Sequence, residues 1–118
     1  MNMPEKVRIV DVGPRDGLQS EKLIVLTETK IQLIHRLAAA GIQSVESGAF
    51  VSPKWVPQMS DSDDVLKGIT RVAGTSYPVL VPNLKGFERA RLANVEEIAL
   101  FSAASETFSF KNTNCTIN

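Results

Sequence analysis

The stretch VRIVDVGPRDGLQ, residues 7–19, decides the fold. Its first half is an apolar run typical of a buried strand, and a Gly-Pro turn that carries Arg15 and Asp16 follows at once. Gly13 and Gly17 flank this pair and let the backbone bend sharply, while the proline restricts the turn. We therefore expect a strand to hold a cation and a carboxylate side by side at its carboxyl end.

An adjacent arginine and aspartate have two interpretations. Such a pair in a loop is usually solvated and contributes only about 0–1 kcal/mol, which favours an ordinary surface pair. Loops at the carboxyl ends of parallel strands form the active sites of α/β proteins, which favours a functional pair. The dipeptide alone does not decide between the two interpretations.

The composition is that of an ordinary globular protein. Of the 118 residues, 43% are hydrophobic and 22% are charged, and 13 basic residues balance 13 acidic ones, which argues against a nucleic-acid-binding surface. No apolar run approaches the roughly 18 residues of a membrane span, and the first ten residues lack the apolar core of a secretory signal. We predict a cytoplasmic protein without nucleic-acid or membrane partners, whose single cysteine, Cys115, forms no internal disulfide.

Hydrophobic periodicity predicts strands that alternate with helices. The expected strands cover residues 7–12, 43–46, 77–81 and 98–101, and the expected helices cover residues 28–40, 61–71 and 84–93. Thr27 is the expected N-cap of the first helix and Gly41 its left-handed C-cap. From Thr107 onward the sequence predicts a loop that leads into a further helix.

Three side chains outside the strands have ordinary structural interpretations. Phe50 and Trp55 belong to an expected structured loop over the sheet, where we predict that both rings are buried. His35 borders the apolar stripe of the first helix, and no second histidine lies within helical reach. Because metal sites need clustered ligands, we interpret His35 as a helix-face residue.

The order of elements indicates a parallel sheet with right-handed crossovers. Four strand–helix units make half of a (β/α)8 TIM barrel of about 250 residues, so we expect residues 1–118 to be the truncated amino-terminal part of a single α/β barrel domain. The absence of GxGxxG after the first strand counts against a dinucleotide-binding sheet. Polar residues that follow the expected strands should converge on one rim; they are Arg15, Asp16, Glu46, Asn83, and Ser102 or Ser105.

Four stretches resemble a known family: VRIVDVGPRDGLQ, AGIQSVESGAFVSPKWVPQM, VPNLKGFERA and SAASETFSFKNTNC. They are similar to the amino-terminal portion of the 3-hydroxy-3-methylglutaryl-CoA lyases of the bacterial type, and the resemblance covers essentially the whole chain. The wider superfamily of barrel metallolyases and Claisen-type synthases shares Arg-Asp-Gly after the first strand. Only the lyase branch reads GPRDGLQ followed by a segment like VSPKWVPQM.

The resemblance implies a divalent-metal-dependent lyase of leucine degradation. Such enzymes cleave 3-hydroxy-3-methylglutaryl-CoA to acetyl-CoA and acetoacetate, so the implied partner is an acyl-CoA substrate, the cofactor Mg²⁺ or Mn²⁺, and the full-length protein a homodimer. By the same resemblance, Asp16 is a metal ligand and Arg15 is the catalytic cation that stabilises the developing oxyanion. Glu46 would orient Arg15 and the substrate hydroxyl as a second catalytic residue.

Three further residues are implied in substrate binding, namely Gln19, Lys22 and Asn83. Gln19 and Lys22 match positions that shape the loop after the turn and its charge network, and Asn83 matches a position at the rim. Two structural alternatives stay open at this point. Glu46 is also compatible, as the less favoured alternative, with a strand-end acid that simply pairs with Arg15. Lys22 is as compatible with a solvated lysine as with a functional one.

The chain also departs from the family pattern. Ala49 stands where the family often has serine, so a hydroxyl near the site is lost. The family's His-x-His metal ligands, its asparagine ligand and its catalytic cysteine belong to the second half of the barrel, and Cys115 is not that cysteine. We therefore predict that residues 1–118 alone are inactive. A related synthase acting on a 2-oxo acid and a non-enzymatic folded module remain the alternative functions.

Overall fold

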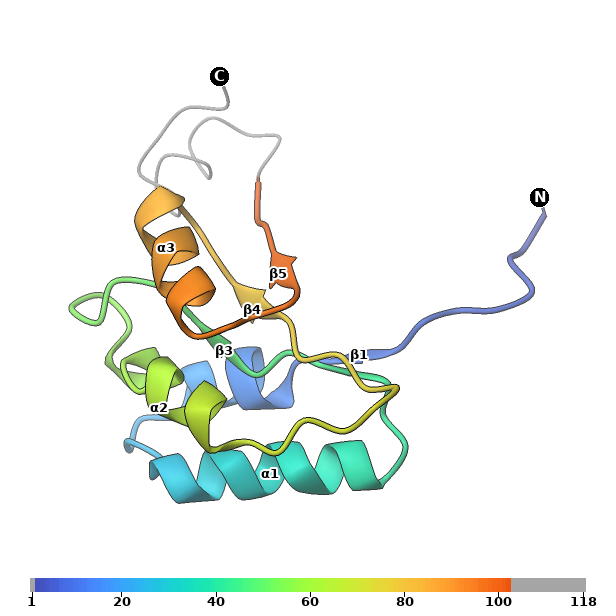
Figure 1. Ribbon diagram of the computed structural model, residues 1–118, viewed down its shortest axis with the longest axis horizontal. Helices are drawn as coiled ribbons and strands as arrows, with labels where there is room; N and C mark the ends of the chain where they lie inside the picture. The colour runs from blue at the N-terminus through green and yellow to red at the C-terminus, as the bar shows by residue number, and fades with distance from the viewer. Residues whose placement is uncertain (1, 103–118) are drawn as a thin grey trace.

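The chain alternates very short strands with three helices in the computed structural model, which describes residues 2–102 (Figure 1). The elements, in chain order, are β1 (Val10–Asp11), η1 (Gly13–Gly17), α1 (Thr27–Ala39), β2 (Ser44–Val45), β3 (Gly48–Ala49), η2 (Pro57–Met59), α2 (Ser62–Gly68), β4 (Val79–Leu80), α3 (Leu84–Leu92) and β5 (Ile98–Ala99). Of these, η1 is a turn of π-helix and η2 a turn of 3₁₀-helix. Between residues 2 and 102 no helix combines the length and apolar character that a membrane crossing requires.

The strands run parallel and follow one another in chain order. β1 pairs with β2, and β3 pairs with β4, which in turn pairs with β5. A parallel bridge between Ser44 and Ser76 links the β2 segment to the chain just before β4. The expected parallel sheet is therefore confirmed, with short pairings in place of long strands.

The expected second strand is split into β2 and β3, and the residues between them join both neighbours. Glu46 N donates to Asp11 O at 2.9 Å on one side, and Ser47 N donates to Pro78 O at 2.9 Å on the other. These alternating bonds extend the segment beyond its predicted end at Glu46. The segment from 44 to 49 is thus the centre of the sheet, with one parallel neighbour on each side.

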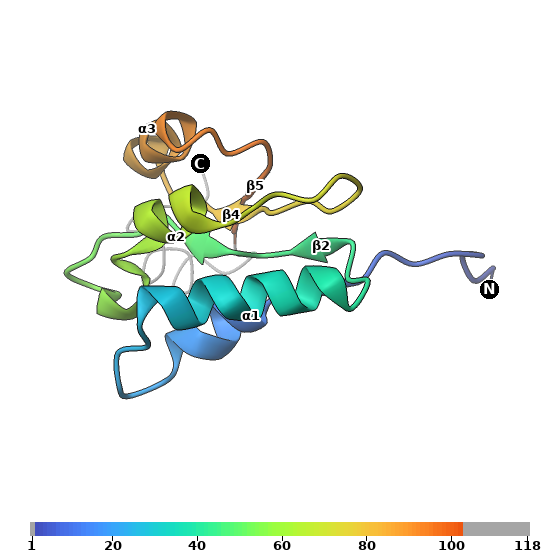
Figure 2. The same cartoon turned by 60° about the horizontal axis from the view of Figure 1, so that its bottom comes forward.

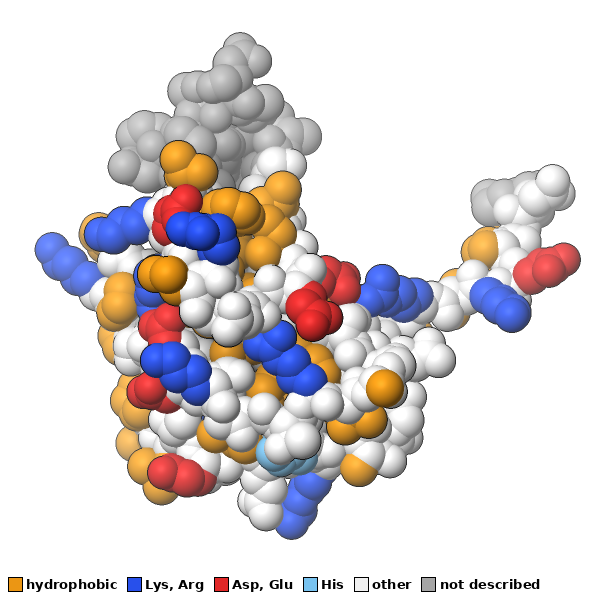
Figure 3. Space-filling view, viewed as in Figure 1, with side chains coloured by type: hydrophobic (Ala, Val, Ile, Leu, Met, Phe, Trp, Pro, Cys, Tyr) orange, Lys and Arg blue, Asp and Glu red, His pale blue; other side chains and the backbone are white. Residues whose placement is uncertain are grey.

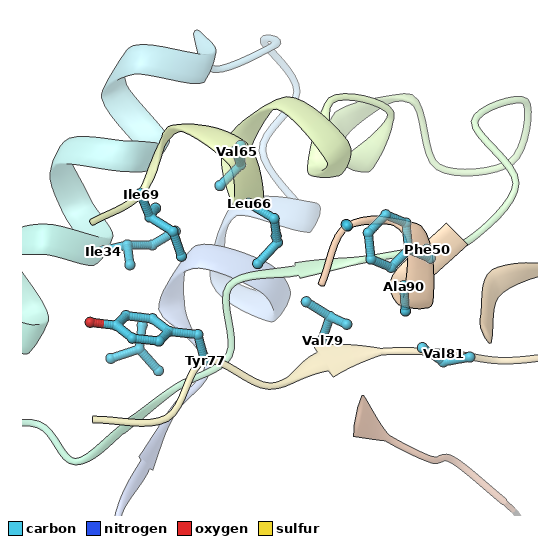
Figure 4. Packing of buried hydrophobic residues seen from close by; sticks show 11 residues of the cluster. Ile34, Phe50, Val65, Leu66, Ile69, Tyr77, Val79, Val81 and Ala90 are labelled. Carbon is cyan, nitrogen blue, oxygen red and sulfur yellow. The ribbon is translucent and has the colours of Figure 1, made fainter. Parts of the chain in front are cut away.

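The apolar core lies between the helices and the central strands (Figure 4), whose ribbons Figure 2 shows from a second side. α1 packs against α2 and β2, and α2 packs against β3. Ile34 of α1 and Val45 of β2 are completely buried, and burial of a side chain of this size contributes about 1.5–3 kcal/mol. The cluster comprises Ile34, Val45, Phe50, Val65, Leu66, Ile69, Tyr77, Val79, Val81, Ala90 and Ala93.

The ends of α1 and α2 confirm one local prediction and contradict two. Gly41 has a φ of +96°, which confirms the left-handed residue expected after α1. Thr27 is not the N-cap, since Leu26 holds that position and the Thr27 hydroxyl donates to Asp61 Oδ2 at 2.7 Å instead. α2 ends at Gly68 rather than at residue 71, because Ile69 is already extended with a ψ of 144°.

Two predictions of burial are wrong. The apolar run before the turn is exposed, with Val7 at 74% and Ile9 at 63%, because β1 pairs only with β2 and nothing in residues 2–102 covers its other side. Trp55 is 79% exposed in a turn, with Lys54 Nζ 5.9 Å from its ring centroid, whereas Phe50 is buried as expected. Apolar side chains are also exposed over α3 and beside β5 (Figure 3), including Leu84, Leu92 and Leu100.

Some predictions concern residues that the structure does not describe. Ser105, Cys115 and the loop and helix expected from Thr107 lie outside the described residues. β5 covers Ile98–Ala99, two residues shorter than the expected strand.

α3 approaches the loop after β3 very closely. A Cβ atom at Gly86 would overlap the backbone oxygen of Phe50. The side chain of Asn83 caps this helix, and its Oδ1 accepts from Gly86 N at 2.8 Å. Glycine at this position therefore lets the amino end of α3 pack against the loop.

Gly86→Ala is expected to lower the free energy of unfolding by about 1–3 kcal/mol, because the added methyl group overlaps the Phe50 carbonyl. Helix propensity alone predicts the opposite sign, a gain of about 0.5–1 kcal/mol. Urea unfolding measures the difference. Gly17→Ala is the control, because a Cβ there meets nothing within 4 Å. A more stable Gly86→Ala variant would contradict the close approach.

Candidate functional site

The turn between β1 and the following loop is held by one backbone carbonyl. Val12 O accepts from Arg15 N at 3.2 Å, from Asp16 N at 2.7 Å and from Gly17 N at 3.1 Å. The Asp11 side chain adds a fourth contact, since its Oδ1 accepts from Gly13 N at 2.9 Å. These contacts fix the backbone of the turn after β1, which carries Arg15 and Asp16.

Arg15 is clamped by Glu46 from the centre of the sheet. Arg15 Nε donates to Glu46 Oε1 at 2.5 Å, and the two side chains are only 17% and 8% exposed. A charge-assisted bond is stronger than a bond between neutral groups, and removal of one partner would leave the other charge largely desolvated and unpaired. The structure pairs Glu46 with Arg15, as both interpretations of Glu46 expect, and the catalytic role of Glu46 stays a prediction.

Asp16 has a different environment. Its Oδ1 accepts from Arg15 Nη1 at 3.2 Å, but its side chain is 65% exposed. An exposed pair of this kind is worth little to stability. Asp16 therefore keeps a carboxylate that is available to a cation, next to an arginine whose position depends on Glu46.

The guanidinium retains donors that the protein does not use. Arginine has five N–H donors, and in residues 2–102 Arg15 contacts other side chains only through Nε and Nη1. Nη2 is left without a partner in this part of the chain. Because its pairing with Glu46 restricts its motion, Arg15 is a pre-positioned donor for an oxygen atom of a bound molecule.

The other predicted site residues do not join this group. Gln19 and Lys22 are exposed on the loop after η1, and neither forms a hydrogen bond with the Arg15 pair within residues 2–102. Asn83 follows β4 and is used as the cap of α3. Ser102 is exposed after β5. The structure thus brings together Arg15, Asp16 and Glu46, and the predicted substrate contacts of the others stay predictions.

The described residues supply only part of a metal site. Within residues 2–102 no three histidine, cysteine, aspartate or glutamate side chains are grouped as metal ligands. Asp16 offers one hard oxygen donor, which suits Mg²⁺ or Mn²⁺ in chemical type. Glu46 is already engaged by Arg15. Asp16 therefore suits one coordination position of a hard cation, and Glu46 supplies no second one.

Sequence reasoning missed two side chains that shape the site. Asp11 braces Gly13, and the Asp-x-Gly spacing of an Asx turn was the available signal. Gln58 binds the backbone of the loop after η1, with partners 33 to 37 residues away in the chain. No local pattern marks such a contact.

Two hollows lie near the ends of the strands. One is at the carboxyl ends of β4 and β5 and is lined by Val81, Pro82, Asn83, Leu84, Phe87, Ile98 and Leu100. The other is at the amino ends and is lined by Arg8, Gln43, Gly74, Thr75 and Ser76. Arg15 and Glu46 line neither of them.

The fold and the charges at the carboxyl ends of its first strands are those of parallel α/β proteins of the TIM-barrel type. The chain belongs to the HMGL-like family, whose model matches residues 6–118. The expected fold class is thereby confirmed, since the chain superposes on the amino-terminal part of solved lyase barrels.

Individual relatives are similar over nearly the whole chain. The chain is 58% identical to the mitochondrial hydroxymethylglutaryl-CoA lyase of Rattus norvegicus over 98% of its own length and 35% of the relative. It matches the crystal structure of hydroxymethylglutaryl-CoA lyase from Pseudomonas aeruginosa with a TM-score of 0.90 and 56% identity, over 99% of this chain and 39% of that one.

A third relative was crystallised with ligands. It is an HMG-CoA lyase from Acinetobacter baumannii in complex with coenzyme A and 3-methylmalate, with a TM-score of 0.90 and 44% identity over 93% of this chain and 36% of that chain. The present chain thus spans between a third and two fifths of the length of these relatives.

A double-mutant cycle tests the difference between the two partners of Arg15. Arg15→Met combined with Glu46→Gln is expected to give a coupling free energy of about 1–3 kcal/mol, because both side chains are largely desolvated. Arg15→Met combined with Asp16→Asn is expected to give less than about 0.5 kcal/mol, because Asp16 is exposed. Urea unfolding of the four variants of each cycle measures both. Equal couplings would contradict the assignment of Glu46 as the clamp.

Proposed function

We propose that this chain supplies the Arg15, Asp16 and Glu46 part of the active site of a 3-hydroxy-3-methylglutaryl-CoA lyase. One observation carries the proposal: a guanidinium held by a buried glutamate lies beside an exposed carboxylate, at the carboxyl ends of neighbouring parallel strands. The identity of more than half of the aligned residues to proteins named as such lyases supports the lyase over a related synthase.

The proposed reaction is a retro-Claisen cleavage. The tertiary hydroxyl of the substrate loses its proton, the C–C bond next to it breaks, and acetoacetate forms while the enolate of acetyl-CoA leaves with the electron pair. Negative charge therefore develops on oxygen in the transition state. A fixed cation beside that oxygen lowers the barrier more than a mobile one, because it needs no reorganisation.

Each of the three residues has a distinct proposed role. Arg15 donates from the unused side of its guanidinium to the oxygen on which charge develops. Glu46 keeps Arg15 in that orientation through the 2.5 Å bond to Nε. Asp16 would hold Mg²⁺ or Mn²⁺, which when bound polarises the oxygen atoms of the substrate.

The proposed substrate class is an acyl-CoA. The Acinetobacter baumannii lyase that matches this chain was solved with coenzyme A, which supports an acyl-CoA ligand. Gln19, Lys22 and Asn83 are the proposed substrate-binding residues, since all three follow strands at the same edge as Arg15. The predicted dimer and the cytoplasmic location stay predictions.

Arg15→Lys in the full-length protein is expected to lower kcat for acetoacetate release by about 10²–10³-fold, the usual effect of removing one oxyanion donor. Lysine keeps the charge but loses the planar fork that binds Glu46 and substrate together. Arg91→Lys is the matched control, because within residues 2–102 Arg91 pairs only with Glu88, and both side chains are exposed on α3. If the unsubstituted protein releases no acetoacetate from hydroxymethylglutaryl-CoA with Mg²⁺ or Mn²⁺, the lyase proposal is wrong.

Asp16→Asn in the full-length protein is expected to weaken Mn²⁺ binding at least about tenfold, because even groups that only support a metal ligand contribute about 10–100-fold. Electron paramagnetic resonance of free Mn²⁺ measures the affinity without a need for turnover. Asp64→Asn, at an exposed carboxylate on α2, is the control. Unchanged Mn²⁺ affinity in Asp16→Asn would remove Asp16 from the proposed ligands.

A further inference from the structure

We infer that Gln58 is a positioning residue that holds residues 18–26, here named the rim loop, in the conformation that binds substrate. The rim loop follows η1 directly and carries Gln19 and Lys22. The inference rests on the proposed function for its effect on substrate binding. That Gln58 holds the rim loop follows from its hydrogen bonds alone.

The side-chain amide of Gln58 binds three backbone groups of the rim loop. Its Oε1 accepts from Val25 N at 2.9 Å, and its Nε2 donates to Leu23 O at 2.8 Å and to Glu21 O at 3.2 Å. Gln58 is only 4% exposed, and its three bonds to the loop are partly buried. One side chain thus uses both donors and its acceptor on a single short stretch of backbone.

Apolar packing holds this stretch only weakly, since Leu18 and Val25 are half-buried and the other apolar side chains are exposed. Leu23 is 83% exposed, Ile24 is 63% exposed and Leu26 is 68% exposed. Their side chains contribute little burial, so the loop lacks the usual source of stability for a surface segment. Its conformation between Leu18 and α1 therefore depends on polar contacts. Two are local, from Glu21 N to Leu18 O at 3.0 Å and from Ser20 Oγ to Gly17 O at 3.3 Å, and the long-range ones come from Gln58.

The backbone of Gln58 is itself held by a lysine of α1. Lys30 Nζ, on a side chain that is 3% exposed, donates to the backbone oxygen of Gln58 and to Asp61 Oδ1 at 2.6 Å. Asp61 Oδ2 accepts from the Thr27 hydroxyl at 2.7 Å. This buried network links the start of α1 to η2 and the start of α2. The rim loop is consequently tied to the rigid part of the fold through one residue.

Arg15 does not depend on this network. Its backbone is bound to Val12 O and its side chain to Glu46, and neither contact involves Gln58. Loss of Gln58 should therefore disturb Lys22, which lies between Glu21 and Leu23, while leaving Arg15 in place. This separation predicts a rise in KM with kcat largely retained, which is the signature of lost binding shared by the ground state and the transition state.

Two substitutions test the inference in the full-length protein. Gln58→Met keeps the approximate volume but removes all three loop contacts, and Gln58→Glu keeps the acceptor for Val25 N while removing both donors. Gln32→Met is the matched control on the exposed face of α1. The readouts are amide hydrogen exchange and the separate values of KM and kcat for hydroxymethylglutaryl-CoA.

The expected result is faster exchange at Val25 and its neighbours in the rim loop, with unchanged exchange at Val45 in the core. We also expect KM to rise about tenfold or more, with kcat within about threefold of the original. Gln58→Glu should disturb the loop at least as much as Gln58→Met, because its buried carboxylate would face the carbonyl oxygens of Glu21 and Leu23. Gln32→Met should leave both readouts unchanged.

Three results would overturn the inference. Unchanged exchange in the rim loop would show that Gln58 does not hold it, and faster exchange throughout, including Val45, would make Gln58 a general stability residue. Faster loop exchange with KM unchanged in an active protein would remove the link to substrate. If the unsubstituted protein lacks lyase activity, the proposed function fails, and hydrogen exchange still decides whether Gln58 holds the loop.

Discussion

The backbone hydrogen bond from Glu46 N to Asp11 O sets the register on which the candidate site depends. In that register Asp11 pairs with Val45, so Glu46 lies one residue further along, level with the turn that carries Arg15. A shift of one residue would send the Glu46 side chain to the opposite face of the sheet. The clamp on Arg15 is therefore a direct consequence of how the first two strands pair.

The core and the rim of the molecule are stabilised by different interactions. Below the carboxyl edge of the strands, apolar side chains of α1, α2 and the sheet are packed out of contact with water. At the rim, loops are held by polar side chains from elements distant in sequence. Gln58 binds the rim loop, and Arg89 of α3 donates to Val51 O at 3.2 Å and to Asp63 Oδ2 at 2.8 Å.

This division has a consequence for function. Polar side chains hold backbone groups at defined distances and directions, whereas apolar contacts are not directional. Polar contacts are therefore better suited than apolar ones to hold a loop in one defined position. The rim loop agrees with this difference, because most of its apolar side chains are exposed while the buried amide of Gln58 supplies directional contacts.

Local patterns predicted the features that depend on neighbouring residues. Helical spacing around Ile34 located α1, Gly41 marked its end, and the alternation of strands and helices indicated a parallel sheet. The same patterns failed where burial depends on what packs nearby. Val7 and Ile9 look like a buried strand, yet β1 has a neighbour on one side only, and Trp55 is placed in an exposed turn.

The sequence by itself determined the class of fold and the pair Arg15 and Asp16, because adjacent residues after a strand need no tertiary contact to be side by side. The resemblance implied that Glu46 orients Arg15, but only the tertiary structure showed that contact and decided that Gln58 holds the rim loop. Glu46 is 31 residues from Arg15, and the loop partners of Gln58 are 33 to 37 residues away. Contacts across such separations are set by strand register and helix packing, which no local spacing encodes.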